Sequence, residues 1–331
     1  MSGHGPETVV ISDGALKELG TILSDYKRPL CVTDRQIHSE YGSHLEEMVG
    51  TSCKWVMGQD YGALDPAKLK DSDIILGFGG GSSLDVAKLI ARETGLDWIS
   101  IPTAASHDGI ASEVASVSHD GYKYSKKCKG PLAVVADTSL ISKAPPILRL
   151  SGIGDIICKT SSLAEWRLAH EASGEPFNPE IYKMVERALV SVIRDDSIGT
   201  LIRAEIDSGR AMSLFGSSRP CSGTEHAISH AMDRSTDGLH GLQVAFATPL
   251  CLYYLHDLGY SEYSPDHIRE FMVDRSMPTT LAEMESTEVM FLDDIEHALK
   301  IMERRGRYSV FRHLNLDKKQ FSRTLRELGY I

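Results

Sequence analysis

The sequence predicts an α/β N-terminal domain with a parallel sheet, followed by an all-α C-terminal domain. In the first 146 residues, short β-rich runs alternate with helical patterns, as is typical of a parallel sheet covered by helices. After residue 146 apolar residues recur at helical spacing, and β-rich runs are almost absent. The chain has 331 residues, of which 42% are hydrophobic, which is enough for two cores.

Five β-rich runs define the expected sheet, and helical patterns such as Ala15–Leu23 and Leu84–Ala91 separate them. The runs are Leu30–Thr33, Ser52–Val56, Ile74–Leu76, Trp98–Ile101 and Leu132–Ala136. Pro145 and Pro146 then mark a boundary, because proline ends regular structure and restrains the residue before it. We therefore expect a dinucleotide-binding domain at residues 1–146 and a helical metal- and substrate-binding domain at 147–331.

The helical half contains five patterns with helical spacing. They are Gly154–His170, Pro179–Arg194, Ala204–Phe215, Glu225–Met232 and Leu242–Leu258. The most apolar segment, Leu242–Leu255, is shorter than the roughly 20 residues of a bilayer-spanning helix and contains Pro249. We expect no membrane insertion.

Charge and cysteine content narrow the function classes. The net charge of −11 argues against general binding to nucleic acid or anionic membranes, which needs a basic surface. Six scattered cysteines without a C-x-x-C pair are typical of reduced core residues. The first seven residues lack the basic start and apolar stretch of a signal peptide. These features predict a soluble, cytoplasmic protein.

A glycine-rich turn follows the expected strand Ile74–Leu76. It reads Gly77-Phe78-Gly79-Gly80-Gly81-Ser82-Ser83 and leads into a helical pattern. Such glycines let the backbone approach a pyrophosphate, and N–H groups at the helix start then point at its oxygens. The spacing differs from G-x-G-x-x-G. A tight turn in which Ser82 or Ser83 caps the helix explains the same residues, so both interpretations stay open.

A loop of small and hydroxylated residues, Pro102–Gly109, follows the expected strand Trp98–Ile101. Loops at the carboxyl ends of parallel strands form the ligand crevice. Thr103 and Ser106 can hydrogen-bond a nicotinamide or ribose there, and Asp108 a substrate hydroxyl. The alternative is a proline-containing turn in which Asp108 bonds its own backbone.

Asp34 and Arg35 follow the strand Leu30–Thr33. Asp34 can bind an adenosine ribose hydroxyl, which favours NAD, whereas Arg35 can accept a 2′-phosphate. The pair does not choose between NAD and NADP, and we expect both cofactors to work.

Three glycine-flanked segments of the helical half hold Asp155, His226 and His240. One carboxylate and two imidazoles with a vacant fourth position make an open catalytic zinc site, which polarises a carbonyl or stabilises an alkoxide. Spacing alone does not bring them together. Asp155 as a helix cap and the histidines as helix-surface residues remain the alternative, and His226 with His230 is a competing ligand pair on one helical face.

Five segments in this order resemble the archaeal sn-glycerol-1-phosphate dehydrogenases over nearly the whole chain. They are GGGSSLDVAK at 79–88, SIPTAASHDGIAS at 100–112, GIGDIICK at 152–159, SGTEHAISHAMD at 222–233 and GLHGLQVAFATP at 238–249. That family belongs to a group with iron-containing alcohol dehydrogenases, glycerol dehydrogenases and dehydroquinate synthases. The resemblance implies a dehydroquinate synthase-like fold, with a nucleotide-binding domain and a helical metal-binding domain.

The resemblance also implies an activity and its residues. The activity is reduction of dihydroxyacetone phosphate to sn-glycerol 1-phosphate by NADH or NADPH, a step of archaeal membrane lipid synthesis. It implies that Asp155, His226 and His240 bind Zn²⁺ and that Asp108 lies near the substrate. His230 falls on a position that lies behind the metal ligands or faces the substrate. The implied cofactor-binding residues are Gly79, Gly80, Gly81, Ser82, Asp85, Thr103, Ser106 and Ser112.

The substrate phosphate needs cationic partners against the acidic background. Lys159 lies one helical turn past Asp155 on the same face and is the first candidate, with Lys123 and Lys126 as alternatives. His107 and His230 are candidates for carrying the proton to the alkoxide.

Three other functions stay open: a glycerol dehydrogenase, a dehydroquinate synthase-like lyase that uses the same NAD and metal, and a non-catalytic nucleotide-binding protein. The expected partner is a small phosphorylated substrate, without nucleic acid. We expect a homo-oligomer, although the sequence does not fix its oligomeric state.

Overall fold

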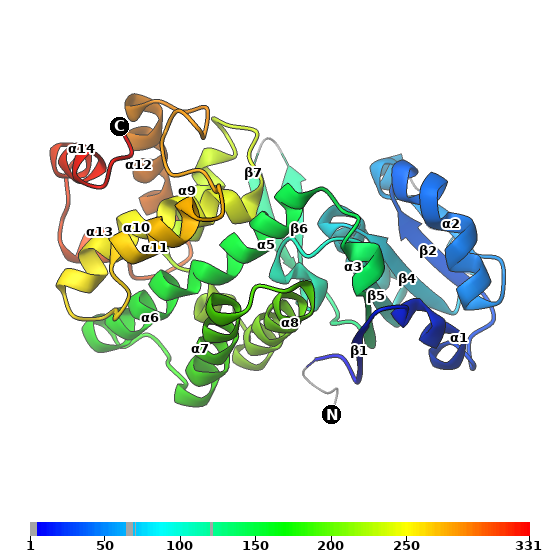
Figure 1. The fold of residues 1–331 in the computed structure, drawn as a ribbon. Coiled ribbons are helices and arrows are strands. Elements are labelled where there is room, and N and C mark those ends of the chain that lie inside the picture. The colour runs from blue at the N-terminus through cyan, green and yellow to red at the C-terminus, as the bar shows by residue number, and fades with distance from the viewer. Residues whose placement is uncertain (1–4, 64–68, 70, 120–121) are drawn as a thin grey trace. The chain divides into compact units, whose positions relative to one another are not determined.

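A computed structural model describes residues 5–63, 69, 71–119 and 122–331. The chain forms two compact units (Figure 1). Unit 1 contains the chain up to Arg149 together with Asp195–Leu214, and unit 2 contains Leu150–Arg194 and Phe215–Ile331. The expected domain boundary between residues 146 and 147 stays a prediction.

Unit 1 is built on a parallel sheet in the order β1-β8-β5-β4-β2-β3. The strands are β1 (Thr8–Ser12), β2 (Pro29–Thr33), β3 (Lys54–Met57), β4 (Ile74–Gly79), β5 (Trp98–Pro102) and β8 (Ala133–Asp137). Every residue of β2, β4, β5 and β8 is buried. Burial on both faces makes these strands continuous apolar runs in the sequence. The predicted parallel sheet is confirmed.

The winding of this sheet reverses between β2 and β4. Helix α2 (Arg35–Val49) leads from β2 to β3, whereas α3 (Gly81–Thr94) leads from β4 to β5 in the other direction. The loops after β2 and β4 therefore diverge at the carboxyl edge of the sheet. Open parallel sheets bind ligands at such a point.

Helix α3 packs closely on β4 because of Gly77. A Cβ atom at Gly77 would lie 2.9 Å from the Cβ of Ala87 and 3.1 Å from a methyl of Leu84. The apolar core of this unit joins strand residues such as Phe78 with helix residues such as Leu45. The helix start after β4 is thereby held against the sheet.

The remaining elements of unit 1 include several that the sequence did not predict. The expected helix Ala15–Leu23 is a 3-10 turn, η1 (Ala15–Glu18), followed by α1 (Leu19–Ile22). An unpredicted antiparallel hairpin is also present. The other elements are η2 (Gly58–Ala63), η4 (Asp108–Ile110), β6 (Val114–His119), β7 (Tyr122–Lys127), α4 (Thr138–Ile141) and α8 (Ile198–Phe215).

Helix α8 joins unit 1 through a close backbone contact. A Cβ atom at Gly209 would lie 2.9 Å from the backbone nitrogen of Ser112 and 3.2 Å from the carbonyl oxygen of Asp108. The glycine therefore lets α8 lie directly against the loop that follows β5.

Unit 2, all of whose residues the structure describes, is helical, as predicted. The helices are α5 (Pro146–Ile157), which begins in unit 1, α6 (Lys159–Ser173), α7 (Pro179–Arg194), η5 (Arg219–Cys221), α9 (Thr224–Met232), α10 (His240–Asp257), α11 (Pro265–Val273), α12 (Glu288–Arg304), α13 (Val310–His313) and α14 (Lys318–Glu327).

Two details of these helices differ from expectation. Pro146 begins α5 rather than ending regular structure, because the fixed φ of proline suits the first helical position and its missing N–H is not needed there. The predicted helix Gly154–His170 is divided at Cys158 into α5 and α6.

Helix α10 runs through the core of unit 2 although it contains Pro249. The hydroxyl of Tyr330 accepts from the N–H of Leu250 (3.2 Å) and donates to the carbonyl of Phe246 (2.6 Å). It thereby links the backbone groups of Leu250 and Phe246, one helical turn apart and next to the proline. Among the described helices, even this apolar one is too short or too polar to cross a membrane.

Candidate functional site

The carboxyl ends of β2, β4 and β5 border a hollow of about 240 Å³ within unit 1, here called the sheet-edge hollow. Its lining includes Asp34, Gly80 and Thr103, three of the predicted cofactor residues. The N–H of Thr103 donates to the carbonyl of Gly79 (3.0 Å), which holds the loop after β5 beside the glycine turn. Three separate sequence segments thus meet at the point where the sheet reverses its winding.

The start of α3 has the features of an anion site. Its N-cap residue is Gly80, no side chain caps it, and no acidic residue lies in the first turn. The serine-capped turn, which the sequence left open, is therefore absent. No protein atom lies within 4 Å of a Cβ atom built on Gly80, so packing does not require glycine here. Open N–H groups and free space suit an approaching phosphate.

Asp85 and Ser112 have partners inside unit 1. The carboxylate of Asp85 accepts from the ammonium of Lys88 (2.9 Å) and from the N–H of Ser116 (3.0 Å), and so ties α3 to β6. Ser112 is buried and donates to the carbonyl of Val114 (3.3 Å). Their predicted contacts with the cofactor stay predictions, as do those of half-buried Ser106 and exposed Ser82.

Asp34 and Arg35 point to different partners. Asp34 is the N-cap of α2, where its Oδ1 accepts from the N–H of Ile37 (2.9 Å). Its Oδ2 lies 3.7 Å from a Cβ atom built on Gly79, so the carboxylate adjoins the glycine turn. Arg35 donates to both carboxylate oxygens of Asp60 at 2.8 Å. Asp34 thus lines the sheet-edge hollow, while the Arg35 guanidinium is bound to Asp60.

In unit 2, two glycines bring Asp155 of α5 and His240 of α10 together. A Cβ atom at Gly154 would lie 2.2 Å from the carbonyl oxygen of Gly241, and one at Gly241 would lie 1.8 Å from that of Ser151. Only glycine allows the two backbones this close. Each of these glycines is the chain neighbour of a predicted metal ligand.

His226 of α9 completes the predicted set. Its Nε2 lies 3.5 Å from Oδ1 of Asp155, and its ring centroid lies 5.2 Å from that of His240. The structure therefore brings Asp155, His226 and His240 together in one buried to half-buried cluster. The alternative of separate surface histidines does not fit this arrangement.

Two side chains that sequence reasoning left without a role orient the imidazoles. Oε1 of Glu225 lies 2.9 Å from Nδ1 of His226, and the hydroxyl of Ser229 lies 2.9 Å from Nδ1 of His240. Engagement of both Nδ1 atoms leaves Nε2 as the ligand nitrogen in each ring, an arrangement that metal-binding histidines commonly use. Glu225 also accepts from the N–H of Gly223 (2.6 Å) and the hydroxyl of Ser161 (2.9 Å), which fixes its position.

Cys158, rather than His240, joins Asp155 and His226 in the group of described residues whose ligand atoms lie within 4.8 Å of one another. Its thiol, however, donates to the carbonyl of Asp155 (3.0 Å) and lies 3.9 Å from Nδ1 of His226, the nitrogen that Glu225 engages. Burial raises the pKa of the Cys158 thiol, although Lys159 and His226 oppose this. A bound metal deprotonates a thiol that coordinates it, so Cys158 stays a candidate ligand beside His240.

Charges around Asp155 keep it ionised. Burial by itself would raise the pKa of Asp155, but the charge of Lys159, the hydrogen bond and charge of His226 and the charge of His240 lower it below its usual range. The ammonium of Lys159 is fully buried, donates to the carbonyl of Asp155 (2.6 Å) and lies 3.8 Å from its Oδ2. Lys159 therefore contacts the candidate metal ligand directly.

The other predicted residues lie as follows. The His230 ring stacks on that of His240 with centroids 5.6 Å apart, and its Nδ1 lies 3.9 Å from Asp233. Burial lowers the pKa of His230, although Asp233 opposes this. Asp108 begins η4 and is half-buried. Lys126 is half-buried, and the side chain of Lys123 lies outside the described part of the chain.

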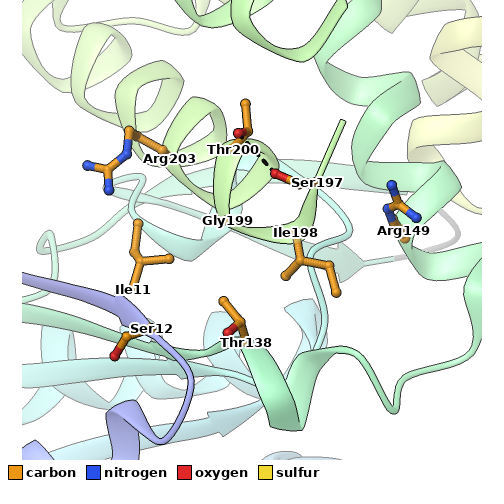
Figure 2. A pocket seen from close by; sticks show the side chains of 9 residues that line it. All are labelled: Ile11, Ser12, Thr138, Arg149, Ser197, Ile198, Gly199, Thr200 and Arg203. Atoms are coloured by element: carbon orange, nitrogen blue, oxygen red, sulfur yellow. Dashed lines mark hydrogen bonds between the residues drawn. The ribbon is translucent and has the colours of Figure 1, made fainter. Parts of the chain in front are cut away.

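A larger hollow of about 700 Å³ lies elsewhere in unit 1, where β1 and β8 end and α8 begins. Figure 2 shows Arg149 and Arg203 on two sides of it. Arg149 donates to the carbonyl (2.7 Å) and carboxylate (2.5 Å) of Asp196, while Ser197 and Thr200 donate to Asp195. The carboxylates of Asp195 and Asp196 thus lie just before α8, at the end of the helix that favours negative charge. None of the predicted site residues lines this hollow.

Comparisons with known proteins identify the family and the fold of the chain. Residues 10–145 match a family described as iron-containing alcohol dehydrogenase. The sequence is 34% identical to a glycerol-1-phosphate dehydrogenase (NAD(P)+) of Methanothrix thermoacetophila, over 92% of this chain and 90% of that one. It is 38% identical to a protein of the same name from Staphylothermus marinus, over 78% and 74%. The structure resembles a probable glycerol dehydrogenase from Sinorhizobium meliloti 1021 with a TM-score of 0.74 and 22% identity, over 89% of each chain.

Proposed function

Because the chain belongs to the family of glycerol-1-phosphate dehydrogenases, we propose that it reduces dihydroxyacetone phosphate to sn-glycerol 1-phosphate with NADH or NADPH. The substrate carbonyl carbon receives a hydride from the reduced nicotinamide and its oxygen receives a proton, which leaves NAD(P)⁺ and the secondary alcohol. The product is a glycerol phosphate of the kind that forms the backbone of archaeal membrane lipids.

One observation carries this proposal: Asp155, His226 and His240 come from three helices to one cluster, and the contact at Gly154 and Gly241 makes that possible. The donor set of one carboxylate and two imidazoles fits a divalent transition metal with an open coordination position. The nearby carboxylate of Glu225 adds negative charge behind the His226 ring, which favours a cation in the cluster. We propose Zn²⁺ as the metal.

When bound, such a metal acts as a Lewis acid on a carbonyl, and the reduced nicotinamide supplies the hydride. The residues of the chain supply orientation. Glu225 and Ser229 hold the rings of His226 and His240 so that each presents Nε2. The ammonium of Lys159 keeps Asp155 ionised and binds its backbone carbonyl. We therefore propose Lys159 first as a positioning residue for the Asp155 carboxylate. Its contact with the substrate phosphate is a second proposal.

The substrate residues are proposed from their positions. His230 stacks on His240, with Asp233 near its Nδ1, and this geometry supports a hydrogen bond from its Nε2 to the substrate. Asp108 is proposed to bind a substrate hydroxyl. We propose that the proton reaches the substrate oxygen from water or from His230, without assigning one of the two as the donor.

The cofactor residues are proposed from their places at or near the sheet-edge hollow. Asp34 would bind the adenosine ribose, and Gly79–Ser82 would bind the pyrophosphate. Thr103, Ser106 and Ser112 would contact the nicotinamide half. Asp85 is proposed to act by holding α3 against β6. We further propose a cytoplasmic homo-oligomer, for which the family relationship is the support.

A substrate panel tests the proposed function. Purified protein is mixed either with NADH or NADPH and dihydroxyacetone phosphate or dihydroxyacetone, or with NAD⁺ or NADP⁺ and glycerol. Oxidation or reduction of the nicotinamide is followed by absorbance. We expect net NADH oxidation with dihydroxyacetone phosphate and chiral analysis that identifies the sn-1 phosphate. Formation of the sn-3 isomer, a preference for unphosphorylated glycerol, or product without net cofactor turnover would each contradict the proposal.

A further inference from the structure

Helices α9 and α12 lie side by side and run in opposite directions. At one end, the hydroxyl of Ser235, just after α9, donates to Asp294 in the first half of α12 (2.7 Å). At the other end, Arg307, just after α12, donates to the carbonyl of Ser222, just before α9 (3.3 Å). The end of α12 therefore lies beside the start of α9, the helix that carries the candidate metal ligand His226.

Arg305 is the C-cap residue of α12, and its side chain is half-buried. Burial is the main cause that lowers the pKa of His230, and the charge of Arg305 lowers it further. This effect of Arg305 is larger than that of His226, which lies one turn from His230 on the same helix. His230 in turn stacks on the candidate metal ligand His240. Arg305 thus lies close to the metal cluster of unit 2.

The guanidinium of Arg305 has no acidic partner. Among the residues that the structure describes, no carboxylate and no other hydrogen-bond acceptor pairs with it. Burial lowers the pKa of Arg305, so the surroundings disfavour its positive charge. Charged side chains that are withdrawn from water are usually paired. An unpaired, half-buried guanidinium beside a candidate metal cluster therefore favours an anionic ligand.

Two neighbouring arginines are already bound. The guanidinium of Arg219 is buried and pairs with the carboxylates of Glu165 (3.3 Å) and Glu175 (2.8 Å). Arg307 donates to the oxygens of two serines in the segment before α9. Burial and the charges of Arg219 and Arg305 lower the pKa of Arg307 to about 10, although both glutamates oppose this. The three arginines thus carry more charge than the two carboxylates paired with them, and Arg305 holds the open donors.

We propose that the guanidinium of Arg305 binds the phosphate group of the substrate. The inference rests on the proposed function, because the phosphate belongs to dihydroxyacetone phosphate. In that molecule one methylene and one oxygen separate the carbonyl carbon from the phosphorus, so a residue that binds the phosphate must lie beside the metal cluster. A guanidinium also offers two parallel N–H groups to phosphate oxygens. The inference moves this contact from Lys159, whose ammonium is bound to the carbonyl of Asp155, to Arg305.

A purely structural role, in which Arg305 only places positive charge at the C-terminus of α12, predicts a different result. Arg304 lies next to it in the last turn of the same helix and is exposed. Arg304→Gln removes the same charge from the same helix end and is the matched control for Arg305→Gln. Arg305→Lys keeps the charge but lacks the two parallel N–H groups, so it should restore part of the phosphate binding.

The test compares a phosphorylated with an unphosphorylated substrate on the full-length, Zn²⁺-loaded protein. We expect Arg305→Gln to lower kcat/KM for dihydroxyacetone phosphate by about tenfold or more, the size of a lost hydrogen bond between charged groups. For dihydroxyacetone, which has no phosphate, kcat/KM should change by less than about twofold. Inorganic phosphate, added as a competitive inhibitor against dihydroxyacetone, should bind about tenfold more weakly to Arg305→Gln. Arg304→Gln should change each quantity by less than about twofold, as expected for an exposed charge.

Unchanged kcat/KM for dihydroxyacetone phosphate in folded Arg305→Gln would overturn the inference and leave the proposed function standing. Equal losses for both substrates, or an equal loss in Arg304→Gln, would also overturn it, because they would show an effect on the helix rather than on the phosphate. Thermal unfolding shows whether each variant is folded, and if Arg305→Gln is not, Arg305→Lys must show a loss confined to the phosphorylated substrate. If the wild-type protein does not reduce dihydroxyacetone phosphate, the proposed function fails and this inference fails with it.

Discussion

The glycines beside the two candidate sites leave room for different groups, a ligand in unit 1 and a second helix in unit 2. In unit 1, Gly80 faces open space at the start of α3, where a ligand can approach the backbone. In unit 2, Gly154 and Gly241 face neighbouring backbone at 2.2 and 1.8 Å, where another helix already fills the space. A glycine near a functional residue therefore indicates close approach, but the approaching group can be a ligand or a second helix.

The largest expected effect comes from adding one methyl group in unit 2. In Gly241→Ala the Cβ would meet the carbonyl of Ser151, a backbone atom that cannot rotate away. We expect a loss of about 3 kcal/mol or more of unfolding free energy, because overpacking against a rigid backbone cannot relax cheaply. Metal content should fall in parallel, because α5 and α10 must separate. Chemical denaturation and elemental analysis measure both, and a fully stable, metal-loaded variant would contradict the close contact.

Replacing Glu225 is expected to weaken metal binding with a much smaller loss of unfolding free energy than Gly241→Ala. In Glu225→Gln the amide oxygen can still accept from His226, but the charge behind the ring is lost. Removing such an orienting carboxylate lowers metal affinity by about 10–100-fold in other sites. Competition with a coloured chelator measures the affinity. Ser161→Ala, which removes one partner of Glu225 and keeps the charge, is the matched control and should change the affinity far less.

Gly80→Ala is the counterpart in unit 1 to the change at Gly241. No protein atom opposes the new methyl group, and the backbone at Gly80 has a negative φ of −77°. We expect the stability to change by less than about 1 kcal/mol. NADH affinity should fall by about tenfold, because the methyl group occupies the space that the pyrophosphate needs. Unchanged NADH binding would place the cofactor elsewhere.

Asp60→Asn should have the smallest effect, on cofactor choice. Arg35 and Asp60 are both more than half exposed, so their ion pair contributes little to stability. Released from Asp60, Arg35 can turn to the 2′-phosphate of NADPH. We expect the ratio of NADPH to NADH affinity to rise by about threefold, within the modest worth of an exposed ion pair. The control is the double variant Arg35→Gln/Asp60→Asn. Its ratio of NADPH to NADH affinity should equal that of Arg35→Gln alone.

Burial explains which strands could be predicted from the sequence and which could not. The strands β2, β4, β5 and β8 are buried along their whole length, and their apolar runs identified them. β1 was missed because it is a half-exposed edge strand with two exposed residues at its start. The hairpin β6–β7 was missed because its pairing is antiparallel and its sequence is rich in polar residues, including lysines at 123, 126 and 127.

For the candidate sites, the sequence and its family resemblance predicted the residues, and the structure supplied the reasons for their proximity. No spacing rule indicates that Gly154 and Gly241, 87 positions apart, lie in contact. The role of Glu225 could not be read from its place beside His226, because chain neighbours on a helix do not usually face each other. Lys159 was predicted to bind the substrate phosphate; its full burial and its bond to the carbonyl of Asp155 could not be read from its place one turn past that residue.

Metal content and cofactor binding, measured on the same preparation of His240→Ala, test the central claim that unit 2 holds the metal and unit 1 holds the cofactor. We expect one divalent ion per wild-type chain, at least tenfold weaker metal binding in the variant, and NADH affinity equal to that of the wild-type protein. Full metal occupancy in the variant, or loss of NADH binding with retained metal, would contradict it.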